Sequence, residues 1–389
     1  MGTMLQNAGL PLGQLPETYN LLHPEIVTDI HRQYLQAGAR VVLANTFGAN
    51  AHKLAGSGVV PEEAIAAGVR CAKKAAKAFD GAYVGLDIGP IGELLFPMGQ
   101  LAFDEAYELF AEQVEAGVKA GADAIFIETM TDLYEAKAAV LAAKEHSSLP
   151  VFCTMSFEKD GRTFTGCQLS AMALTLSGLG VDGLGMNCSV GPVEMLEMAE
   201  EILRYTDLPL IIKPNAGLPE IVDGRTRYSI TREEFVEAMQ ALVRRGAAMV
   251  GGCCGTDPGY IRALAEAVRG ITPKRPAYAP VSAVCSHAET VVIDRVRPIG
   301  ERINPTGKKR MKQALQTHEM AYLVSQGLEQ VEAGAKILDV NVGLPGLDEA
   351  AMMVEAVQTL QSVLTAPLQI DSSHPEVLEQ ALRAYNGVP

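Results

Sequence analysis

Three cysteines have a spacing that suits metal binding. Cys253 and Cys254 are adjacent within the segment GGCCGT at 251–256, and Cys188 follows an asparagine earlier in the chain. Thiolate sulfur is a preferred ligand of zinc, and a catalytic zinc keeps one of its four positions open. Three cysteines would leave that position for a substrate, and a thiol bound there would be held as the nucleophilic thiolate. The pattern therefore predicts attack by sulfur on a carbon electrophile.

The two adjacent cysteines need a turn in the backbone, because neighbours on a regular strand point to opposite faces. Glycines at 251, 252 and 255 allow such a turn, since glycine tolerates positive φ and close approach. Spacing alone leaves two other interpretations, which are three small buried residues or a disulfide between Cys253 and Cys254. We do not count the remaining cysteines as ligands: Cys71, Cys153, Cys167 and Cys285.

The elements that must position these thiols alternate between short apolar strands and amphipathic helices. Strands are predicted over 41–45, 83–87, 124–128, 151–155, 183–186, 210–213 and 248–251. Such alternation implies a parallel sheet with right-handed crossovers. Cys188 and the Cys253–Cys254 pair each follow a strand, with one strand between them. All three would therefore lie on the face of a barrel where chemistry takes place.

The predicted fold class is α/β, and residues 1–270 are expected to form a (β/α)8 TIM barrel that lacks most of its first strand. A closed barrel needs eight strands, and segment 1–5 is too short to supply the missing one. We expect the chain to begin just inside that strand or its exit loop. An open doubly wound sheet is the alternative.

A second unit is predicted after a linker at 271–290, where three prolines lie close together. Residues 291–389 resume the alternation, with a strand ending near Ile299, a single helix over 311–332, and further strands at 337–340 and 368–370. These strand–helix units do not close a barrel, so the second (β/α) barrel is expected to be incomplete.

Composition narrows the classes of partner. The chain has 389 residues, a net charge of −14 and 48% hydrophobic residues, so a sizeable core can form, while the acidic balance argues against nucleic acid and anionic membranes. No apolar run reaches the length of a spanning helix, and no secretory signal opens the chain. Seven cysteines, an odd number, favour metal-binding or catalytic thiols in a reducing cytoplasm over a disulfide scaffold.

The motifs at the strand ends resemble those of the zinc-dependent homocysteine S-methyltransferase family. The segments that carry the resemblance are MGTML at 1–5, NTFGAN at 45–50, FIETM at 126–130, GMNC at 185–188, KPNAG at 213–217 and GGCCGT at 251–256. The resemblance covers about residues 1–270. It implies zinc ligands at Cys188, Cys253 and Cys254, with the sulfur of homocysteine as the fourth ligand.

The same resemblance implies roles for other side chains. Glu128 would hold the amino group of homocysteine, and the backbone at Gly2 and Thr3 would meet its carboxylate. Asn215 is expected to line the site as a catalytic residue, with a turn-stabilising asparagine as the alternative. Asp87 also ends a strand, and we interpret it as a turn residue. The Asp-Gly that opens the first strand in the family has no match here.

Three motifs of the second unit resemble the pterin-binding barrel of cobalamin-dependent methionine synthases: GERINPTG at 300–307, LDVNVG at 338–343 and IDSS at 370–373. A pterin ring offers an edge of amide and amine groups, which carboxylate and amide side chains match with paired hydrogen bonds. The resemblance implies that Asn304 and Asp371 contact the pterin, while Asp339 and Asn341 shape the same pocket. Capping of a loop is the alternative role for each.

Together the resemblances imply methyl transfer to homocysteine, giving methionine. The homocysteine thiolate on zinc would accept the methyl group of methylcobalamin, which 5-methyltetrahydrofolate would restore. Nothing in 1–389 resembles the cobalamin-binding Asp-x-His-x-x-Gly segment, so cobalamin would come from a downstream domain or a separate chain. The alternatives are a cobalamin-independent homocysteine S-methyltransferase, a dihydropteroate synthase and a non-catalytic zinc or redox barrel.

Overall fold

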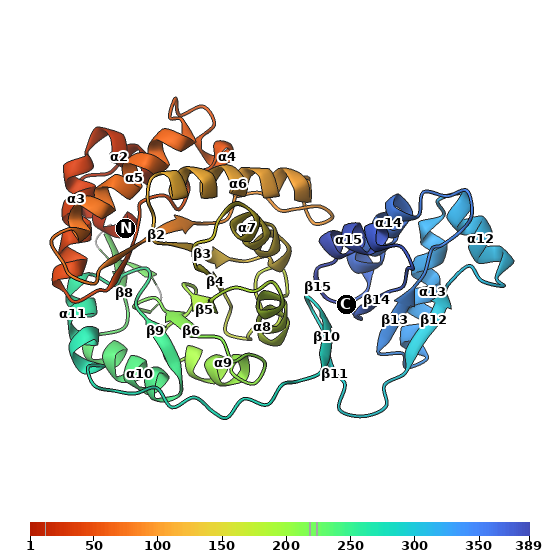
Figure 1. Cartoon of the computed structure of the whole chain (residues 1–389). Helices are drawn as coiled ribbons and strands as arrows, with labels where there is room; N and C mark the ends of the chain where they lie inside the picture. The colour runs from red at the N-terminus through yellow and green to blue at the C-terminus, as the bar shows by residue number, and fades with distance from the viewer. Residues whose placement is uncertain (12, 218, 223–224) are drawn as a thin grey trace.

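The computed structural model describes residues 1–11, 13–217, 219–222 and 225–389. Its largest sheet is parallel and has seven strands in the order β1-β2-β3-β4-β5-β6-β9. The strands are β1 Val41–Leu43, β2 Tyr83–Ile88, β3 Ala124–Met130, β4 Val151–Met155, β5 Gly183–Asn187, β6 Leu210–Lys213 and β9 Ala247–Val250. The strands thus follow one another in the sheet in their chain order, without the reversal of strand order that defines a doubly wound sheet. The sheet curls into an incomplete barrel, as predicted (Figure 1).

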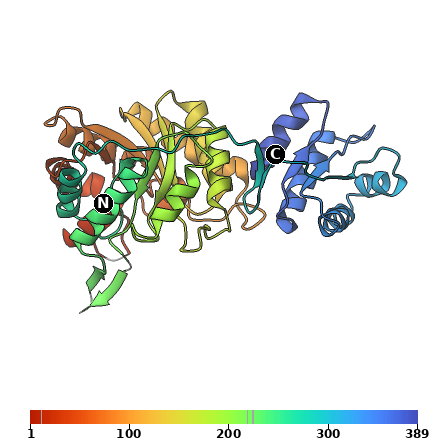
Figure 2. The ribbon, with the colours of Figure 1, turned by 90° about the horizontal axis from the view of Figure 1, so that it is seen from below.

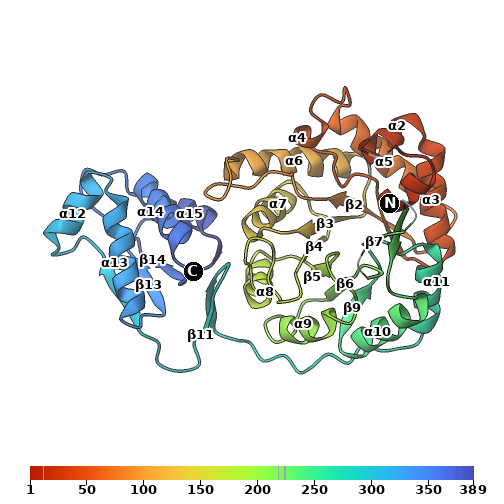
Figure 3. The same cartoon turned by 180° about the vertical axis from the view of Figure 1, so that it is seen from behind.

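Helices surround the outer face of the curled sheet (Figure 3). They are α2 Tyr19–Leu22, α3 Pro24–Gln36, α4 Ala51–Leu54, α5 Pro61–Ala76, α6 Phe103–Lys119, α7 Leu133–His146, α8 Leu169–Gly178, α9 Met195–Ile202, α10 Arg232–Arg244 and α11 Pro258–Ala267, while α1 Gly2–Asn7 packs against α3. Several starts follow from local sequence: α3, α5 and α11 have proline in the first turn, and α10 has a capping box between Thr231 and Glu234. The main core lies between these helices and the sheet.

Close packing at two glycines shows which side chains of β2 and β3 point into the barrel. A Cβ on Gly117 of α6 would lie 2.4 Å from Leu86, so Leu86 of β2 faces the helices. Its neighbours Gly85 and Asp87 therefore face the interior of the barrel, because side chains alternate along a strand. A Cβ on Gly85 would lie 2.5 Å from the ring of Phe126 in β3, which places Phe126 in the interior as well.

The chain begins with a short helix, where the sequence predicted the end of the first strand or its exit loop. Residues 2–7 form the short helix α1, and its Leu5 is fully buried in a small cluster with residues of α3. No described strand pairs with the outer edge of β1 or of β9. With no strand hydrogen-bonded beside it, the segment satisfies its backbone locally, as in the bond from the Met4 N–H to the Met1 carbonyl.

A second parallel sheet contains β12 Ile299–Ile303, β13 Ile337–Val340 and β14 Leu368–Ile370 in that order. Its helices are α12 Lys309–Gln316, α13 Met320–Glu332, α14 Glu349–Val363 and α15 Pro375–Ala384. This unit has a hydrophobic core of its own. Two expectations were wrong: β12 starts at Ile299 instead of ending there, and the helix predicted over 311–332 is two helices, separated where His318 adopts a φ of 52°.

Two small antiparallel sheets were not anticipated. One joins β10 Ala283–Ser286, β11 Thr290–Val292 and β15 Gly387–Val388, so part of the predicted linker is structured. The other is the hairpin of β7 Pro219–Val222 and β8 Arg225–Tyr228, which extends from the barrel (Figure 2).

A polar contact between α7 and the end of α15 joins the barrel to the second unit. Lys137 is 6% exposed, and its ammonium donates hydrogen bonds to the backbone carbonyls of Leu382 and Tyr385. Burial lowers the pKa of Lys137 to about 7. The guanidinium of Arg383 lies over the ring of Tyr107, 5.0 Å from its centroid. These contacts hold the second unit against the outside of the barrel, on the face formed by α6 and α7.

Candidate functional site

The three predicted cysteines converge where β5 and β9 end. The sulfur atoms of Cys188, Cys253 and Cys254 all lie within 4.8 Å of one another, and each residue is half-buried. A tetrahedral zinc with Zn–S bonds of about 2.3 Å sets its sulfurs about 3.8 Å apart. The triad therefore fits one zinc ion with small side-chain adjustments, and the described residues contain no other such group of three cysteine, histidine or carboxylate side chains.

Unusual backbone geometry brings Cys188 to this point. Cys188 and Ser189 have φ values of 64° and 56°, a conformation that residues other than glycine seldom adopt. The turn is tied to the neighbouring strand by a 3.0 Å hydrogen bond from the Cys188 N–H to the Lys213 carbonyl. Such strain is typical of functional sites, where the surrounding structure holds a side chain in a fixed direction.

The turn that carries Cys253 and Cys254 depends on the glycine that follows. Gly255 has a φ of 82°, and a Cβ there would lie 2.4 Å from the ring of Tyr228. Glycine is therefore required both by conformation and by the close approach of the ring. Burial, and after it the Cys254 thiol, raises the pKa of the Tyr228 hydroxyl, so this residue lies beside the thiol triad. The sequence analysis missed Tyr228, since it lies in the unanticipated hairpin.

Asn215 connects the two cysteine loops. It is 5% exposed; its Oδ1 accepts a 3.0 Å hydrogen bond from the Cys254 N–H, and its Nδ2 donates to the Ser189 carbonyl at 3.4 Å. These contacts place the amide between the two sides of the triad. Asn215 therefore supports both turns, which is the alternative role that the sequence left open, and its expected catalytic role stays a prediction.

Glu128 is paired with a lysine that sequence reasoning did not select. The Lys213 ammonium donates to Glu128 Oε2, and both side chains are only 13% exposed. Burial alone would lower the pKa of Lys213, but the Glu128 carboxylate outweighs burial and raises it. Glu128 in turn contributes to raising the pKa of Cys253, so the ion pair lies close to the triad. A lysine at the end of a strand, beside the asparagine of the KPNAG segment, was the available signal.

Asn187 is fully buried directly before Cys188 and joins three strands. Its Oδ1 accepts hydrogen bonds from the Thr129 N–H at 2.8 Å and from the Thr154 hydroxyl at 2.6 Å, while its Nδ2 donates to the Thr129 hydroxyl at 2.7 Å. Thr129 follows Glu128 and has a φ of 62°. Asn187 therefore stabilises the strained turn that aims Glu128 into the barrel.

Asp87, interpreted from sequence as a turn residue, instead faces this interior layer. It is 8% exposed, and burial followed by the Glu128 charge raises its pKa. The positive α-amino group of Met1 acts to lower the pKa of both Asp87 and Cys254, so the start of α1 lies near the site. Gly2 and Thr3 follow in α1, and their contact with a substrate carboxylate stays a prediction.

The three clustered thiols all have raised pKa values. The hydrogen bond shared with the Cys188 thiol, together with burial, raises the pKa of Cys253 to about 12. Clustered thiols therefore stay protonated at neutral pH unless a positive charge lies among them. A divalent cation would supply that charge, because coordination deprotonates a thiol outright.

The four predicted pterin residues all follow β12, β13 and β14 or lie within them. Asn341 Nδ2 donates to Asp371 Oδ2 at 3.0 Å, so these two side chains are in direct contact. Asp339 is 6% exposed and accepts a hydrogen bond from Gln369 at 2.9 Å. Asn304 accepts the Thr306 N–H at 2.9 Å and thus stabilises its own loop. Asn341 and Asp371 are brought together, while Asp339 and Asn304 have structural partners.

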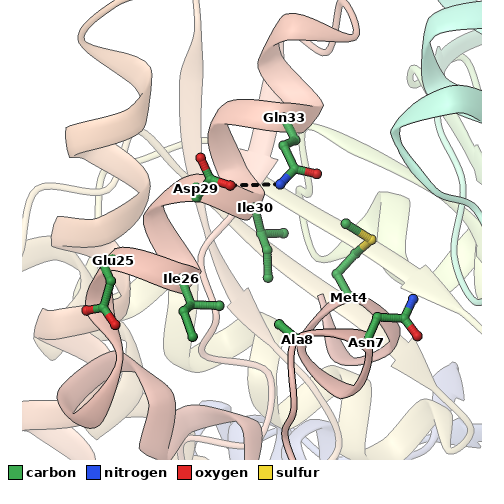
Figure 4. Close-up of a pocket in the computed structure, with 8 residues that line it drawn as sticks. All are labelled: Met4, Asn7, Ala8, Glu25, Ile26, Asp29, Ile30 and Gln33. Atoms are coloured by element: carbon green, nitrogen blue, oxygen red, sulfur yellow. Dashed lines mark hydrogen bonds between the residues drawn. The ribbon is translucent and has the colours of Figure 1, made fainter.

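A separate pocket of about 470 Å³ lies between α1 and α3 (Figure 4). Its lining includes Met4, Ile26 and Ile30, with Gln33 donating to Asp29 at the rim. None of the predicted site residues contributes to this lining. We therefore place the functional site at the thiol triad.

Comparison with known families agrees with the geometry of the triad. The family described as homocysteine S-methyltransferase matches residues 1–268. The chain belongs to the homocysteine S-methyltransferase family. A second family, described as pterin binding enzyme, matches residues 300–388. The predicted class of enzyme, a methyltransferase, is confirmed, as is the succession of a homocysteine methyltransferase unit and a pterin-binding unit.

The relatives of this family member include two mycobacterial proteins. Methionine synthase of Mycobacterium tuberculosis (strain ATCC 25618 / H37Rv) is 32% identical over 410 residues, and that of Mycobacterium leprae (strain TN) is 30% identical over 413 residues. Each match covers 100% of this chain and 34% of the relative. The chain thus spans about a third of the length of these curated relatives.

Solved structures support the fold. The homocysteine methyltransferase MmuM from Escherichia coli superposes with a TM-score of 0.58 in both its metallated and its oxidized form, at 22% and 23% identity. The matches cover 68% of this chain and 93% and 92% of those chains. At this identity the likeness extends to the barrel fold alone. Among the described residues, no helix combines the length and apolar character needed to cross a membrane.

Replacing Asn187 by alanine should destabilise the site layer. The change leaves the Thr129 N–H and the Thr154 hydroxyl without their buried acceptor, so we expect the free energy of unfolding to fall by about 2–4 kcal/mol. Urea denaturation followed by circular dichroism measures the loss. Asn7→Ala, at an exposed position of α1, serves as the control and should change stability by less than about 0.5 kcal/mol. Equal stability of the Asn187 variant and the unmodified chain would contradict this role.

Proposed function

We propose that the barrel binds homocysteine as a thiolate and methylates it to methionine, using zinc held by Cys188, Cys253 and Cys254. The observation that carries the proposal is the convergence of three thiols within 4.8 Å at the strand ends of a chain in the homocysteine S-methyltransferase family. When bound, zinc supplies a fourth coordination position at which a substrate thiol is held deprotonated. A three-cysteine set leaves that position free, whereas structural zinc sites are usually closed by four protein ligands.

The residues around the triad orient the substrate. Glu128, which is paired with Lys213, is proposed to accept a hydrogen bond from the amino group of homocysteine. The backbone at Gly2 and Thr3 is proposed to bind its carboxylate. Asn215 keeps the Cys254 loop in place through its hydrogen bond to the Cys254 N–H. Holding the sulfur and the amino acid end at fixed points converts methyl transfer into a reaction between oriented groups, which lowers its entropic cost.

The second unit is proposed to bind 5-methyltetrahydrofolate at Asn304, Asp339, Asn341 and Asp371. The Asn341–Asp371 contact presents an amide and a carboxylate together, a pair suited to the hydrogen-bonding edge of a pterin. We propose the division 1–270 for the homocysteine barrel, 271–290 for the linker and 291–389 for the pterin unit.

Cobalamin is proposed to carry the methyl group between the two sites. The amine of a methylated pterin is a poor leaving group, so a strong nucleophile such as reduced cobalt is needed to accept its methyl group. A cobalamin-binding domain downstream or on a separate chain would provide it, as the combination with a pterin unit and the longer relatives suggest. A reducing cytoplasm, where thiols stay free, suits such a centre. The pterin match argues against a cobalamin-independent enzyme, and the thiol triad argues against a dihydropteroate synthase.

Zinc content tests the ligand set. The purified chain should bind about one zinc ion, and Cys188→Ala, Cys253→Ala or Cys254→Ala should each lower the bound zinc at least several-fold, because loss of a thiolate leaves two protein ligands. Atomic emission of dialysed protein measures the metal. Cys153→Ala, at a buried cysteine in the interior of β4, is the matched control and should retain full zinc. Unchanged zinc in any of the three triad variants would remove that residue from the set.

Folate binding tests the second unit. Asp371→Asn should weaken binding of 5-methyltetrahydrofolate about 10-fold or more, since it removes a charged acceptor from the pterin edge. Equilibrium dialysis measures the dissociation constant. The matched control is Asp294→Asn, whose carboxylate is 57% exposed before β12, and it should bind as the unmodified chain does. Equal affinity in the Asp371 and Asp294 variants would exclude Asp371 as a pterin ligand.

A further inference from the structure

A carboxylate oxygen without a partner lies in the interior layer of the barrel. Asp87 is 8% exposed, and its Oδ1 accepts no hydrogen bond from any described residue. A buried acceptor left unpaired costs free energy, so its presence calls for an explanation. The side chain faces the barrel interior, because Leu86 beside it packs on α6. The open oxygen is thus directed toward the space enclosed by the strand ends.

The charges around Asp87 are unevenly balanced. Among the charged groups, Glu128 on the adjacent strand β3 raises the pKa of Asp87 most, and Lys213, which lowers it most, is already hydrogen-bonded to Glu128. The α-amino group of Met1 lowers the pKa of Asp87 less than Lys213 does. Glu17, in the 3-10 turn before α2, raises it slightly further. One lysine thus serves two interior carboxylates, and the layer can accept another cation.

The depth of this layer matches the size of an amino acid thiol. Lys213 is the register partner of Asn187, which directly precedes the triad residue Cys188. Successive residues of a strand advance by about 3.3 Å, so the ion pair lies roughly one residue below the sulfurs. In homocysteine two methylene groups separate the sulfur from the carbon that bears the ammonium. A sulfur at the triad can therefore place its ammonium among these carboxylates.

We propose that Asp87 is a substrate-positioning residue that binds the α-ammonium group of homocysteine opposite Glu128. Lys213 holds Glu128 in place through their ion pair before the substrate arrives, and the ammonium supplies the partner that Asp87 Oδ1 lacks. Asp87 would thereby select α-amino thiols over simple thiols. The inference rests on the proposed function, because it assumes that the sulfur of the substrate binds at the triad.

Two ligands that differ only in the amino group separate this role from a general effect on the metal site. The zinc-loaded chain is titrated calorimetrically with L-homocysteine and with 4-mercaptobutanoate, which has the same thiol and carboxylate but no amino group. Asp87→Asn should weaken homocysteine binding about 10- to 100-fold, the range for a lost hydrogen bond to a charged group. The same variant should bind 4-mercaptobutanoate as well as the unmodified chain, or better.

A second readout tests whether the variant is intact. Asn at position 87 removes a buried charge without a partner, so the melting temperature of the free protein should be unchanged or higher, and zinc should stay near one ion per chain. Asp123→Asn is the matched control, since Asp123 pairs with Lys73 at the opposite end of the strands. It should leave the affinity for both ligands unchanged.

The outcomes distinguish the inference from the function on which it rests. Homocysteine binding by the unmodified chain with equal affinity in Asp87→Asn would overturn the role of Asp87 alone. An equal loss for both ligands would also overturn it, because the amino group would then not be involved. A zinc-loaded chain that binds neither ligand would overturn the proposed function together with this inference.

Discussion

The structure depends on one constraint, which is that three sulfur atoms from two separate loops meet at a single point. Cys188 reaches it only through two consecutive residues with positive φ, and Cys254 only because Gly255 admits the ring of Tyr228. Each strained residue other than glycine costs about 1–3 kcal/mol. Hydrogen bonds across the loops, including those of Asn215, offset part of this cost. A metal bound by all three thiolates would account for the remainder.

The curled parallel sheet makes this convergence possible. All seven strands point the same way, so their carboxyl ends form one rim, and the alternation of side chains places every second residue in the interior. At the rim this alternation gathers Asp87, Glu128, Asn187 and Lys213, which are polar, beneath the sulfurs. Below them the interior is apolar, with Phe126 filling the space left by Gly85. An apolar floor beneath a charged layer would strengthen electrostatic contacts to the zwitterionic substrate that we propose.

Much of this arrangement could be predicted from the sequence, because it follows from local patterns. Apolar runs of strand length alternating with amphipathic helices gave the seven strands and their order, and the glycines around Cys253 and Cys254 indicated the turn. The pairing of Lys213 with Glu128 could not be predicted in this way, since the two residues are 85 positions apart and belong to non-adjacent strands. The burial of Asp87 also depends on neighbours that only the curling of the sheet brings close.

Other differences have equally physical causes. A helix period continues through residues 311–332, but positive φ at His318 divides it into α12 and α13, and residue patterns do not reveal a left-handed conformation at histidine. The helix α1 replaces an expected strand remnant because a strand is stable only beside a partner. Tyr228 could not be predicted as a site residue, because its hairpin interrupts the alternation of strands and helices from which the elements were predicted.

X-ray absorption of the zinc-loaded chain tests the account most directly, because it counts the sulfur neighbours of the metal. We expect three sulfurs and one lighter atom in the free protein, and four sulfurs once homocysteine is bound. Four sulfurs without homocysteine, or a count that stays at three when homocysteine is saturating, would contradict it.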